Sequence, residues 1–437
     1  MKKAPLQGTD TTEKRKVRVL IVAAHDSLGG AARAIYRVYS ALREYESRRI
    51  EVTLRVPNKT RNDPGVIGGK PRRNRWEFVR YWLRTRWRAK FPGKPFQTEN
   101  RILHSQALYD TGMGREINEY GADVVMLGWL GGSTLSIEEI GRIKAPVVWR
   151  MSDLWLVSGA EHYTDSARYA EGYSRTSRPH YETGPDINRK TFRRKIHHWK
   201  TPQHVVGLSR WMLEQAEMSV LTKTWPRSLI PVPLDPEEWS PRPAIEAREQ
   251  FGLPKDKMLV GFGAGQASKH FHKGADLLFE ALNTLWDGRS EKGKPEFELV
   301  VFGDEENPRT NLGFEVHYLG KLNNSELAGV YSAIDVLVVP SRLEAFGQVA
   351  AEAQMCGAPL VVFDNSGLTD VVSDRVTGRV VPAFDTQALA DAIAWVLADR
   401  DRRDSLRKAA RERASELWHP RVVARQYADV LISAAKN

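Results

Sequence analysis

The sequence predicts an α/β protein built from two parallel-sheet domains. Apolar runs typical of buried strands alternate with helical stretches along most of the chain. A proline-rich segment, Pro231 to Pro243, interrupts this alternation, and the pattern starts again after it. A chain of 437 residues is also too long for one ordinary hydrophobic core. We therefore expect two Rossmann-like domains joined by a linker.

The first domain is expected over residues 17–230, after a polar and disordered tail at residues 1–16. Its first strand, Val17 to Ala24, is followed by a loop and by a helix from Ala31 to Glu44. Gly29 and Gly30 lie in that loop, where glycine lets the backbone approach a ligand closely. The helix N-terminus that follows favours an anion by roughly 0.3–1 kcal/mol. Further strands are expected at Glu51–Val56, Asp123–Leu127, Val147–Met151 and His204–Leu208.

The second domain is expected over residues 231–415, and residues 416–437 are expected to form a separate helix. The domain begins with a strand at Met258–Phe262, a glycine-rich loop at Gly263–Gly265 and a helix at Gly274–Leu285. The last helix of the chain is expected at about Arg421 to Ala435. Further strands are expected at Glu298–Phe302, Val336–Val339, Leu360–Phe363 and Arg379–Val381.

Composition limits the function classes. No run of eighteen apolar residues exists, so no transmembrane helix is expected, and the N-terminus lacks the apolar core of a signal peptide. The single cysteine, Cys356, cannot form an internal disulfide, which fits a reducing cytoplasm, and we interpret it as a small buried residue. A formal charge of +11 favours anionic partners such as phosphorylated ligands, acidic lipids or nucleic acid.

The most informative segment is Ser341 to Gly367, in which seven residues separate Glu344 from Glu352. Its pattern is strand, loop, helix, turn and strand, the unit of a parallel sheet. Glu344 and the Phe346-Gly347 loop therefore follow the carboxyl end of a strand, where open parallel sheets bind ligands. Glu352 falls one to two turns into the next helix, within reach of a ligand that the loop holds.

This segment resembles the nucleotide-sugar site of the retaining glycosyltransferases of family 4, which have the two-domain GT-B fold. Ala345 stands where that family usually has glycine. The resemblance implies two domains that face a central cleft, with the C-terminal helix crossing back onto the first domain. It also implies that Glu344 contacts the donor sugar, that backbone amides of Phe346 and Gly347 bind sugar or phosphate, and that Glu352 accepts hydrogen bonds from the ribose.

A second segment, Val147 to Tyr163, is similar to the branch of that family that builds colanic acid and related exopolysaccharides. The family places a histidine beside Asp153 that faces the reaction centre, and this chain has Ser152 there. The resemblance implies that Asp153 and His162 line the cleft from the first domain. The matching residues are Trp149, Asp153, Trp155, Gly159, His162 and Tyr163.

The donor diphosphate needs cations or helix N-termini if no metal holds it. Gly263 to Leu278 resembles the loop that grips this diphosphate in family 4, and Lys273-Gly274 matches its Lys-Gly pair. The arginine that the family places shortly before that pair is missing, and Lys269 is our candidate for its role. Gly29 and Gly30 would close on the phosphate from the first domain. We expect no metal, since the one Asp-x-Asp sequence, Asp399-Arg400-Asp401, has the character of a solvated turn.

Gly69 to Phe96 is rich in arginines and aromatic residues, and the stretch from Arg75 to Phe91 predicts an amphipathic helix. Two interpretations stay open. The helix either binds the headgroups of an anionic membrane or packs its apolar face into the first domain. A third interpretation, nucleic-acid binding by arginine and aromatic stacking, lacks a supporting signature, so we expect no nucleic-acid partner.

Together these features predict a metal-independent, cofactor-independent, retaining glycosyltransferase. It would transfer a sugar from a nucleotide-diphosphate donor to a glycan or a polyprenyl-linked glycan in bacterial surface or exopolysaccharide synthesis. We expect it in the cytoplasm, peripherally on the inner face of the membrane. Three alternatives remain: a degenerate relative that binds nucleotide without transfer, a basic protein that binds membrane or nucleic-acid surfaces, and a sugar-nucleotide epimerase of the same fold.

Overall fold

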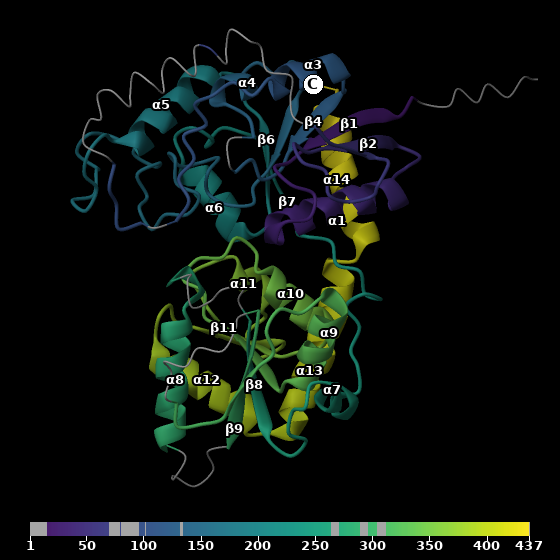
Figure 1. The fold of residues 1–437 in the computed structure, drawn as a ribbon, viewed down its shortest axis with the longest axis vertical. Helices are drawn as coiled ribbons and strands as arrows, with labels where there is room; N and C mark the ends of the chain where they lie inside the picture. The colour runs from purple at the N-terminus through teal and green to yellow at the C-terminus, as the bar shows by residue number, and fades with distance from the viewer. Residues whose placement is uncertain are drawn as a thin grey trace, which may run out of the picture.

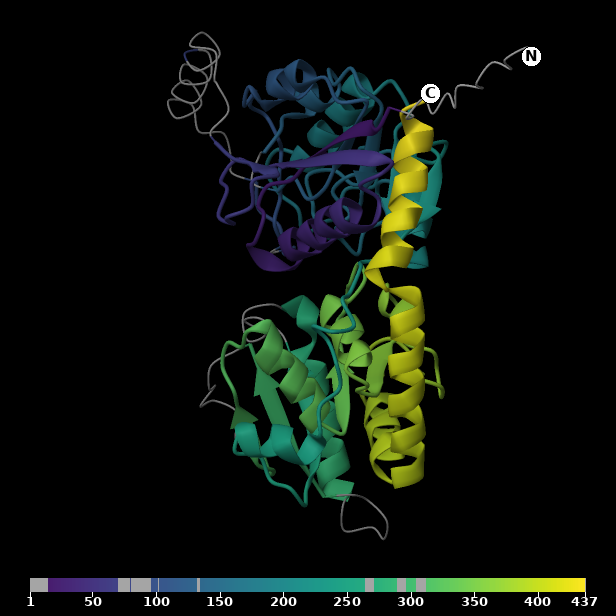
Figure 2. The same ribbon diagram turned by 90° about the vertical axis from the view of Figure 1, so that its right-hand side faces the viewer.

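The structure is a computed structural model, and it describes residues 15–69, 79, 96–100, 102–131, 134–263, 271–288, 296–303 and 312–436. Two α/β domains lie end to end, and the last two helices run along one side of both (Figures 1 and 2). Each domain contains one parallel sheet, with seven strands in the first and six in the second. The predicted fold class is confirmed.

The sheet of the first domain has the strand order β3-β2-β1-β4-β5-β6-β7. Its central strands are mostly apolar because helices cover both faces of a parallel sheet. The elements are β1 (Val17–Val22), α1 (Gly29–Tyr45), β2 (Ile50–Arg55), β3 (Val66–Ile67), α3 (Met113–Tyr120), β4 (Val124–Leu127), α4 (Ile137–Ile140), β5 (Val147–Arg150), α5 (Ile187–His198), β6 (His204–Gly207), α6 (Arg210–Met218) and β7 (Arg227–Leu229).

The sheet of the second domain has the strand order β10-β9-β8-β11-β12-β13. Val336 of β11 pairs with Val260 of β8, so these two strands are neighbours although 75 residues separate them. The elements are α7 (Ala244–Gln250), β8 (Met258–Gly263), the 3₁₀ helix η2 (Phe271–Lys273), α8 (Ala275–Asp287), β9 (Phe297–Phe302), β10 (Val316–Tyr318), α9 (Asn324–Ala333), β11 (Val336–Val339), α10 (Gln348–Met355), β12 (Leu360–Phe363), α11 (Leu368–Val371), β13 (Gly378–Val381), α12 (Thr386–Leu397), α13 (Arg400–Leu417) and α14 (Pro420–Ala434).

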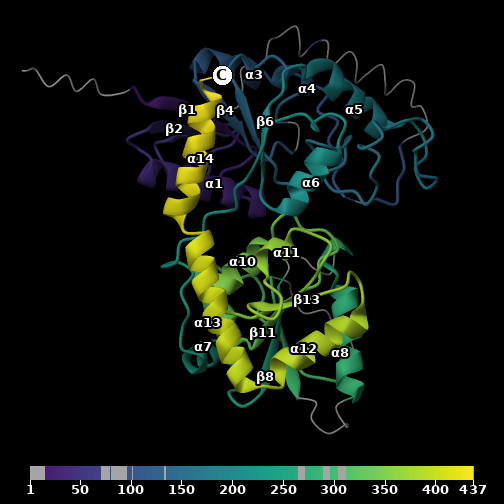
Figure 3. The ribbon, with the colours of Figure 1, turned by 180° about the vertical axis from the view of Figure 1, so that it is seen from behind.

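Helix α14 returns to the first domain, as the crossing helix was expected to do (Figures 2 and 3). Its buried residues recur every three or four positions and therefore share one face. That face joins the core formed by β1, β4 and α1. At its centre the hydroxyl of Tyr427 accepts a hydrogen bond of 3.1 Å from Nε of Arg150. The second domain is thus tied to the first by its C-terminal helix as well as by the linker after β7.

The structure differs from the sequence predictions at the edge strands and at Asp399-Arg400-Asp401. The edge strands β3, β7 and β10 were missed, because two or three residues are too few to show a period-two pattern. Asp399-Arg400-Asp401 is not a turn between helices, since it begins α13. The Asp399 side chain caps that helix by accepting a hydrogen bond of 2.9 Å from the backbone N–H of Arg402. Among the described helices, none has the length and apolar composition needed to cross a membrane.

Candidate active site

A cleft of about 240 Å³ lies between the domains, at the carboxyl ends of strands from both sheets. In the second sheet, β8 and β11 are neighbours whose connecting segments leave in opposite directions along the strand order. Such a reversal opens a crevice at the strand ends, and parallel sheets bind ligands there. The first domain contributes the segments that follow β1, β4 and β5. The cleft is lined by Gly30, Ala31, Ala34, Trp129, Arg150, Ser152, Asp153, Tyr163, Leu208, Glu344, Ala345, Phe346, Gly347 and Gln348.

Glu344 and Lys273 meet at the side of the cleft formed by the second domain. Glu344 follows β11 and Lys273 ends η2 after β8, so the pairing of these strands brings the two side chains together. Nζ of Lys273 donates a hydrogen bond of 2.6 Å to a carboxylate oxygen of Glu344. Both side chains keep some exposure, 28% for Lys273 and 17% for Glu344. The pair therefore offers an acceptor for sugar hydroxyls beside a cation for phosphate.

The glycines beside this pair are required by the backbone. Gly274 has a φ of +70°, and a Cβ there would lie 1.9 Å from the carbonyl oxygen of Pro340 at the end of β11. Gly347 has a φ of +90°, and a Cβ there would lie 2.4 Å from the side chain of Leu368. Only glycine accommodates both the left-handed conformation and the close approach. The aromatic ring of Phe346 packs against Trp418 in the core, with centroids 5.7 Å apart, so the side chain points away from a ligand.

Three helix N-termini are free of side-chain caps around this cleft. They are α1 after Leu28, α8 after Gly274 and α10 after Gly347. Among the other described helices, α6, α9, α12 and α13 carry capping side chains, whereas α3, α7 and α11 do not. α1 and α10 approach each other, because a Cβ on Gly30 would lie 2.9 Å from the side-chain amide of Gln348. Uncapped N–H groups and converging helix dipoles favour an anion such as a diphosphate. Gly29 begins α1 with a φ of +82°.

Asp153 lies at the side of the cleft formed by the first domain, just after β5. One carboxylate oxygen accepts hydrogen bonds from Nε1 of Trp129 at 2.7 Å and from Nδ1 of His162 at 2.6 Å. The other accepts the backbone N–H of Trp155 at 2.9 Å. Three donors fix the orientation of Asp153, which is 8% exposed.

His162 lies behind Asp153. It is 4% exposed, and its Nε2 forms a hydrogen bond of 2.7 Å with the hydroxyl of Ser105. Both ring nitrogens therefore have partners, and the ring does not line the cleft. In this geometry His162 orients Asp153 rather than touching a ligand.

Glu352 is on α10, one turn beyond the cleft, and 1% of its surface is exposed. Arg37 of α1 forms an ion pair with it, 2.8 Å between Nη2 and Oε1. The angles of this contact are unfavourable, and within the described residues Glu352 Oε1 has no hydrogen bond. Burial raises the pKa of Glu352, while the nearby charges of Arg37 and Arg33 oppose that rise. The carboxylate thus couples the two domains and retains unused acceptor capacity toward a ligand.

Sequence reasoning missed two polar side chains at this interface, Arg37 and Arg150, and assigned Tyr163 no role beyond its match to the family segment. Arg150 is the last residue of the otherwise apolar strand β5, and a charged residue at that position is the sequence feature that could have indicated its role. Its Nη1 donates a hydrogen bond of 2.9 Å to the hydroxyl of Ser152, the position where family 4 has histidine. Tyr163 stacks on His272 of the second domain, with centroids 6.3 Å apart. Burial raises the pKa of Tyr163 well above its usual range, and the negative charges of Glu344 and Asp153 add to the effect.

The structure thus brings Gly30, Asp153, Glu344, Phe346 and Gly347 to the lining of one cleft and places Lys273 against Glu344. Gly29, His162 and Glu352 do not line this cleft.

Several sequence expectations lie outside the described residues, among them residues 1–14 of the expected tail and residues 264–270 of the expected diphosphate loop. Lys269 and, apart from Val79, the proposed amphipathic helix from Arg75 to Phe91 also lie outside them.

The second domain matches a known family. Residues 244–413 match the family described as "Glycosyl transferases group 1". Over 201 residues the chain is 35% identical to a D-inositol 3-phosphate glycosyltransferase of Stackebrandtia nassauensis, covering 43% of this chain and 44% of that protein. Over 188 residues it is 38% identical to the enzyme of the same name from Xylanimonas cellulosilytica, covering 40% and 42%. The chain thus aligns with less than half the length of these curated relatives.

Solved structures resemble the whole chain. Sucrose-phosphate synthase from Thermosynechococcus elongatus has a TM-score of 0.62 and 20% identity, covering 95% of this chain and 98% of that one. Anabaena HepE in complex with UDP and glucose has a TM-score of 0.63 and 15% identity, covering 95% and 100%. WaaG, a glycosyltransferase involved in lipopolysaccharide biosynthesis, has a TM-score of 0.61 and 17% identity, covering 95% and 99%. The fold is that of these GT-B structures, and within the second domain residues 244–413 match the group 1 family model.

Proposed function

We propose that this protein is a glycosyltransferase that transfers a sugar from a nucleotide-diphosphate donor to a hydroxyl group of an acceptor. The observation that carries the proposal is the cleft itself. Glu344, which pairs with Lys273, and the uncapped N-termini of α1 and α10 line one space with Asp153 of the first domain, and the uncapped N-terminus of α8 follows Lys273 directly. A diphosphate fits the cation and the helix N-termini, and a sugar fits the carboxylates.

In the proposed reaction Lys273, with Lys269 as a further candidate, stabilises the diphosphate as the bond between the sugar C1 and the phosphate oxygen breaks. The acceptor oxygen bonds to C1 on the same face, so the anomeric configuration is retained. Its proton passes to the departing phosphate oxygen, and no metal is required. Glu344 and the backbone amides of Phe346 and Gly347 position the sugar, Glu352 accepts from the ribose, and Asp153, oriented by His162, faces the acceptor. Gly29 and Gly30 allow α1 to approach the phosphate.

We propose a glycan attached to a polyprenyl lipid as the acceptor, used in bacterial surface or exopolysaccharide synthesis at the inner face of the cytoplasmic membrane. The resemblance of Val147–Tyr163 to the exopolysaccharide branch and the basic composition support this choice. The curated relatives are named for D-inositol 3-phosphate, which is the competing acceptor. An acceptor phosphate is common to both candidates.

Turnover with defined donors tests the proposal. The purified chain is incubated with UDP-, GDP- and ADP-glucose, alone, with a short-chain polyprenyl-diphosphate glycan, or with D-inositol 3-phosphate. We expect nucleoside diphosphate release with one donor only when an acceptor is present, unchanged by EDTA, and a product with the donor's anomeric configuration. Glu344→Gln should lower the rate at least about 100-fold. Arg425→Gln, a change on the exposed side of α14, should not.

Each alternative gives a different result. A degenerate relative would show a thermal shift with one nucleotide but no release of product. An epimerase would convert the donor without an acceptor. A nucleic-acid binder would be stabilised by a short DNA duplex in a strongly salt-dependent manner and by no nucleotide. If Glu352→Ala folds and binds nucleotide as tightly as the wild type, the assignment of Glu352 to the ribose is wrong.

A further inference from the structure

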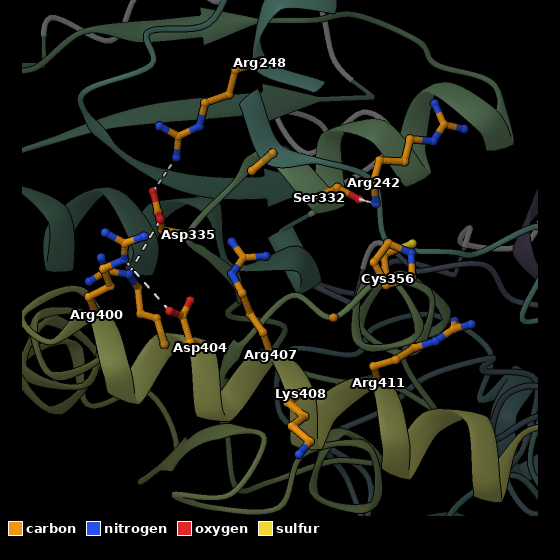
Figure 4. Close-up of a pocket in the computed structure, with 14 residues that line it drawn as sticks. Arg242, Arg248, Ser332, Asp335, Cys356, Arg400, Asp404, Arg407, Lys408 and Arg411 are labelled. Atoms are coloured by element: carbon orange, nitrogen blue, oxygen red, sulfur yellow. Dashed lines mark hydrogen bonds and ion pairs between the residues drawn. The ribbon is translucent and has the colours of Figure 1, made fainter. Parts of the chain in front are cut away.

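A second cavity, of about 490 Å³, lies in the second domain away from the cleft. Its walls are the linker around Pro241, the Cys356-Gly357 turn that follows α10, and one side of α13. Figure 4 shows side chains reaching this space from α13 and from the helices and turns that face it, with Arg248 on α7 and Ser332 on α9. The cleft lies at the N-terminal end of α10 and this cavity at its C-terminal end. Eight residues at 1.5 Å each place the two sites about 12 Å apart.

The sequence of α13 places basic residues on one face. Arg400, Asp404, Arg407, Lys408 and Arg411 follow each other at intervals of one, three or four residues, so they occupy neighbouring positions on a helix. The whole lining contains seven basic side chains and two carboxylates. The lining therefore carries a net positive charge, although Arg400 and Lys408 are also largely exposed to solvent, at 86% and 77%.

The two carboxylates of the lining, Asp335 and Asp404, already form ion pairs with arginines. Asp335 pairs with Arg248 at 2.8 Å and with Arg403 at 3.7 Å, and Asp404 pairs with Arg400 at 3.9 Å. Among the described residues, no carboxylate forms an ion pair with Arg407 or Arg411. These two guanidinium groups therefore have no directly paired carboxylate among the described residues, while the charges of Asp335 and Asp404 act on Arg407 from a greater distance.

Backbone carbonyls hold these two arginines in place. Arg411 donates to the carbonyl of Trp239 at 2.7 Å and to that of Pro236 at 3.0 Å, which ties α13 to the linker. Arg407 donates to the carbonyl of Ile334. Within the described residues this is its one hydrogen bond, whereas a guanidinium carries five N–H donors. Burial lowers the pKa of Arg407; the charges of Asp335 and Asp404 oppose this shift, and those of Arg248 and Arg403 add to it. An anion would offset this cost.

We propose that this cavity binds a small polyanion that carries two or more phosphate groups. Arginine favours phosphate because its planar N–H groups match two oxygens at once. Cations on α13 and around the linker surround the space, so two linked phosphates can contact more of them than one. The volume is within the range of small-ligand sites, about 300–1,000 Å³. The site uses none of the residues assigned to the donor, so it stands even if the proposed transferase activity fails.

Tripolyphosphate titration by isothermal calorimetry tests this site. Because a polyphosphate could also enter the donor cleft, every protein carries Lys273→Ala. We expect one saturable site in that background and at least tenfold weaker binding after Arg407→Met, which removes the central guanidinium (Figure 4). Arg400→Glu, a change at a side chain that is 86% exposed, should weaken binding similarly without affecting the fold. The matched control Arg425→Glu reverses one exposed charge on α14 and should change the affinity less than twofold.

Two results would overturn the proposal. One is the absence of saturable binding in the Lys273→Ala protein. The other is an equal loss of affinity from Arg400→Glu and Arg425→Glu, which would mean that net charge rather than the cavity attracts the anion.

Discussion

The ion pair between Arg37 and Glu352 joins the two domains, and we expect its removal to lower the free energy of unfolding substantially. Arg37 belongs to α1 of the first domain and Glu352 to α10 of the second, and their side chains are 14% and 2% exposed. The informative change is Arg37→Met, which keeps most of the side-chain volume and removes the charge. The Glu352 carboxylate then stays buried without its closest cation.

The magnitude follows from this burial. Breaking a buried pair by removing one partner costs about 3–5 kcal/mol, because the remaining charge has lost both water and its counter-ion. Glu352→Gln should cost less, since a neutral amide replaces the charge. In the double variant neither charge is left alone. We therefore expect the double variant to lose at least about 2 kcal/mol less unfolding free energy than the sum of the losses in the two single variants.

Urea unfolding followed by tryptophan fluorescence measures these free energies. The control is Arg33→Met, one turn earlier on α1. Arg33 acts on Glu352 through its charge, but within the described chain it makes no ion pair with it. We expect Arg33→Met to cost about 1 kcal/mol or less. Equal losses from Arg33→Met and Arg37→Met, or additive effects in the double variant, would refute the reasoning.

The pH dependence gives a second check. Burial raises the pKa of Glu352 above its ordinary value, so the folded protein holds this proton more tightly than the unfolded chain does. The resulting stability is present below the unfolded pKa and is lost as the pH rises toward the folded pKa. Arg37 limits this effect by lowering the pKa. Arg37→Met should therefore lose more stability than the wild type as the pH rises from about 5 to 8.

Three further changes test the scaffold of the site. Lys195 is fully buried and donates to three backbone carbonyls within residues 155–159, so Lys195→Met should cost about 3–5 kcal/mol in urea unfolding. Gly274→Ala should cost at least about 2 kcal/mol and weaken nucleotide binding, because its Cβ would lie 1.9 Å from a carbonyl oxygen at the end of β11. Burial raises the pKa of Glu161 from 4.5 to about 7. Ionisation of this group should therefore remove up to about 3 kcal/mol of stability as the pH rises through that interval. Glu161→Gln should abolish this dependence of the unfolding free energy on pH.

Each change has a matched control or a contradicting result. Lys190→Met alters an exposed lysine of the same helix and should cost less than about 0.5 kcal/mol. A similar small loss from Lys195→Met would contradict the role of its three hydrogen bonds. Gly320→Ala also has a positive φ, +63°, but meets no atom within 4 Å, so equal costs at Gly320 and Gly274 would mean that the clash is relieved. An unchanged pH slope in Glu161→Gln would assign that slope to another group.

The sequence was sufficient for the central strands and for one side of the site. β8, β11 and β12 are continuous apolar runs, as expected of strands buried on both faces, so their positions and the loops after them could be predicted. Lys273 and Glu344 were found independently through local motifs. Their direct contact follows once β8 and β11 are neighbours. Short-range pattern and sheet topology are enough for this part of the cleft.

The other side depends on contacts that no local pattern reveals. Arg37 and Glu352 meet across the domain interface, and neither residue's surroundings in the sequence indicate the other. The role of His162 was equally hidden, because only the fold shows that both of its ring nitrogens have partners. The spacing of a motif gives the position of a side chain, whereas its availability to a ligand depends on the tertiary partners that surround it.

Those partners also resolve an electrostatic difficulty in the proposed donor site. Two carboxylates beside a diphosphate would repel it if both were unpaired. Here each has a cation, since Lys273 lies 2.6 Å from Glu344 and Arg37 lies 2.8 Å from Glu352. Arg150 adds a further buried positive charge at the cleft, and three helix N-termini add partial positive charge. The carboxylates can therefore accept hydrogen bonds from sugar hydroxyls while the cleft as a whole still attracts an anion. The Arg37–Glu352 pair spans both domains. Glu352 therefore has its neutralising cation only when the two domains are in contact.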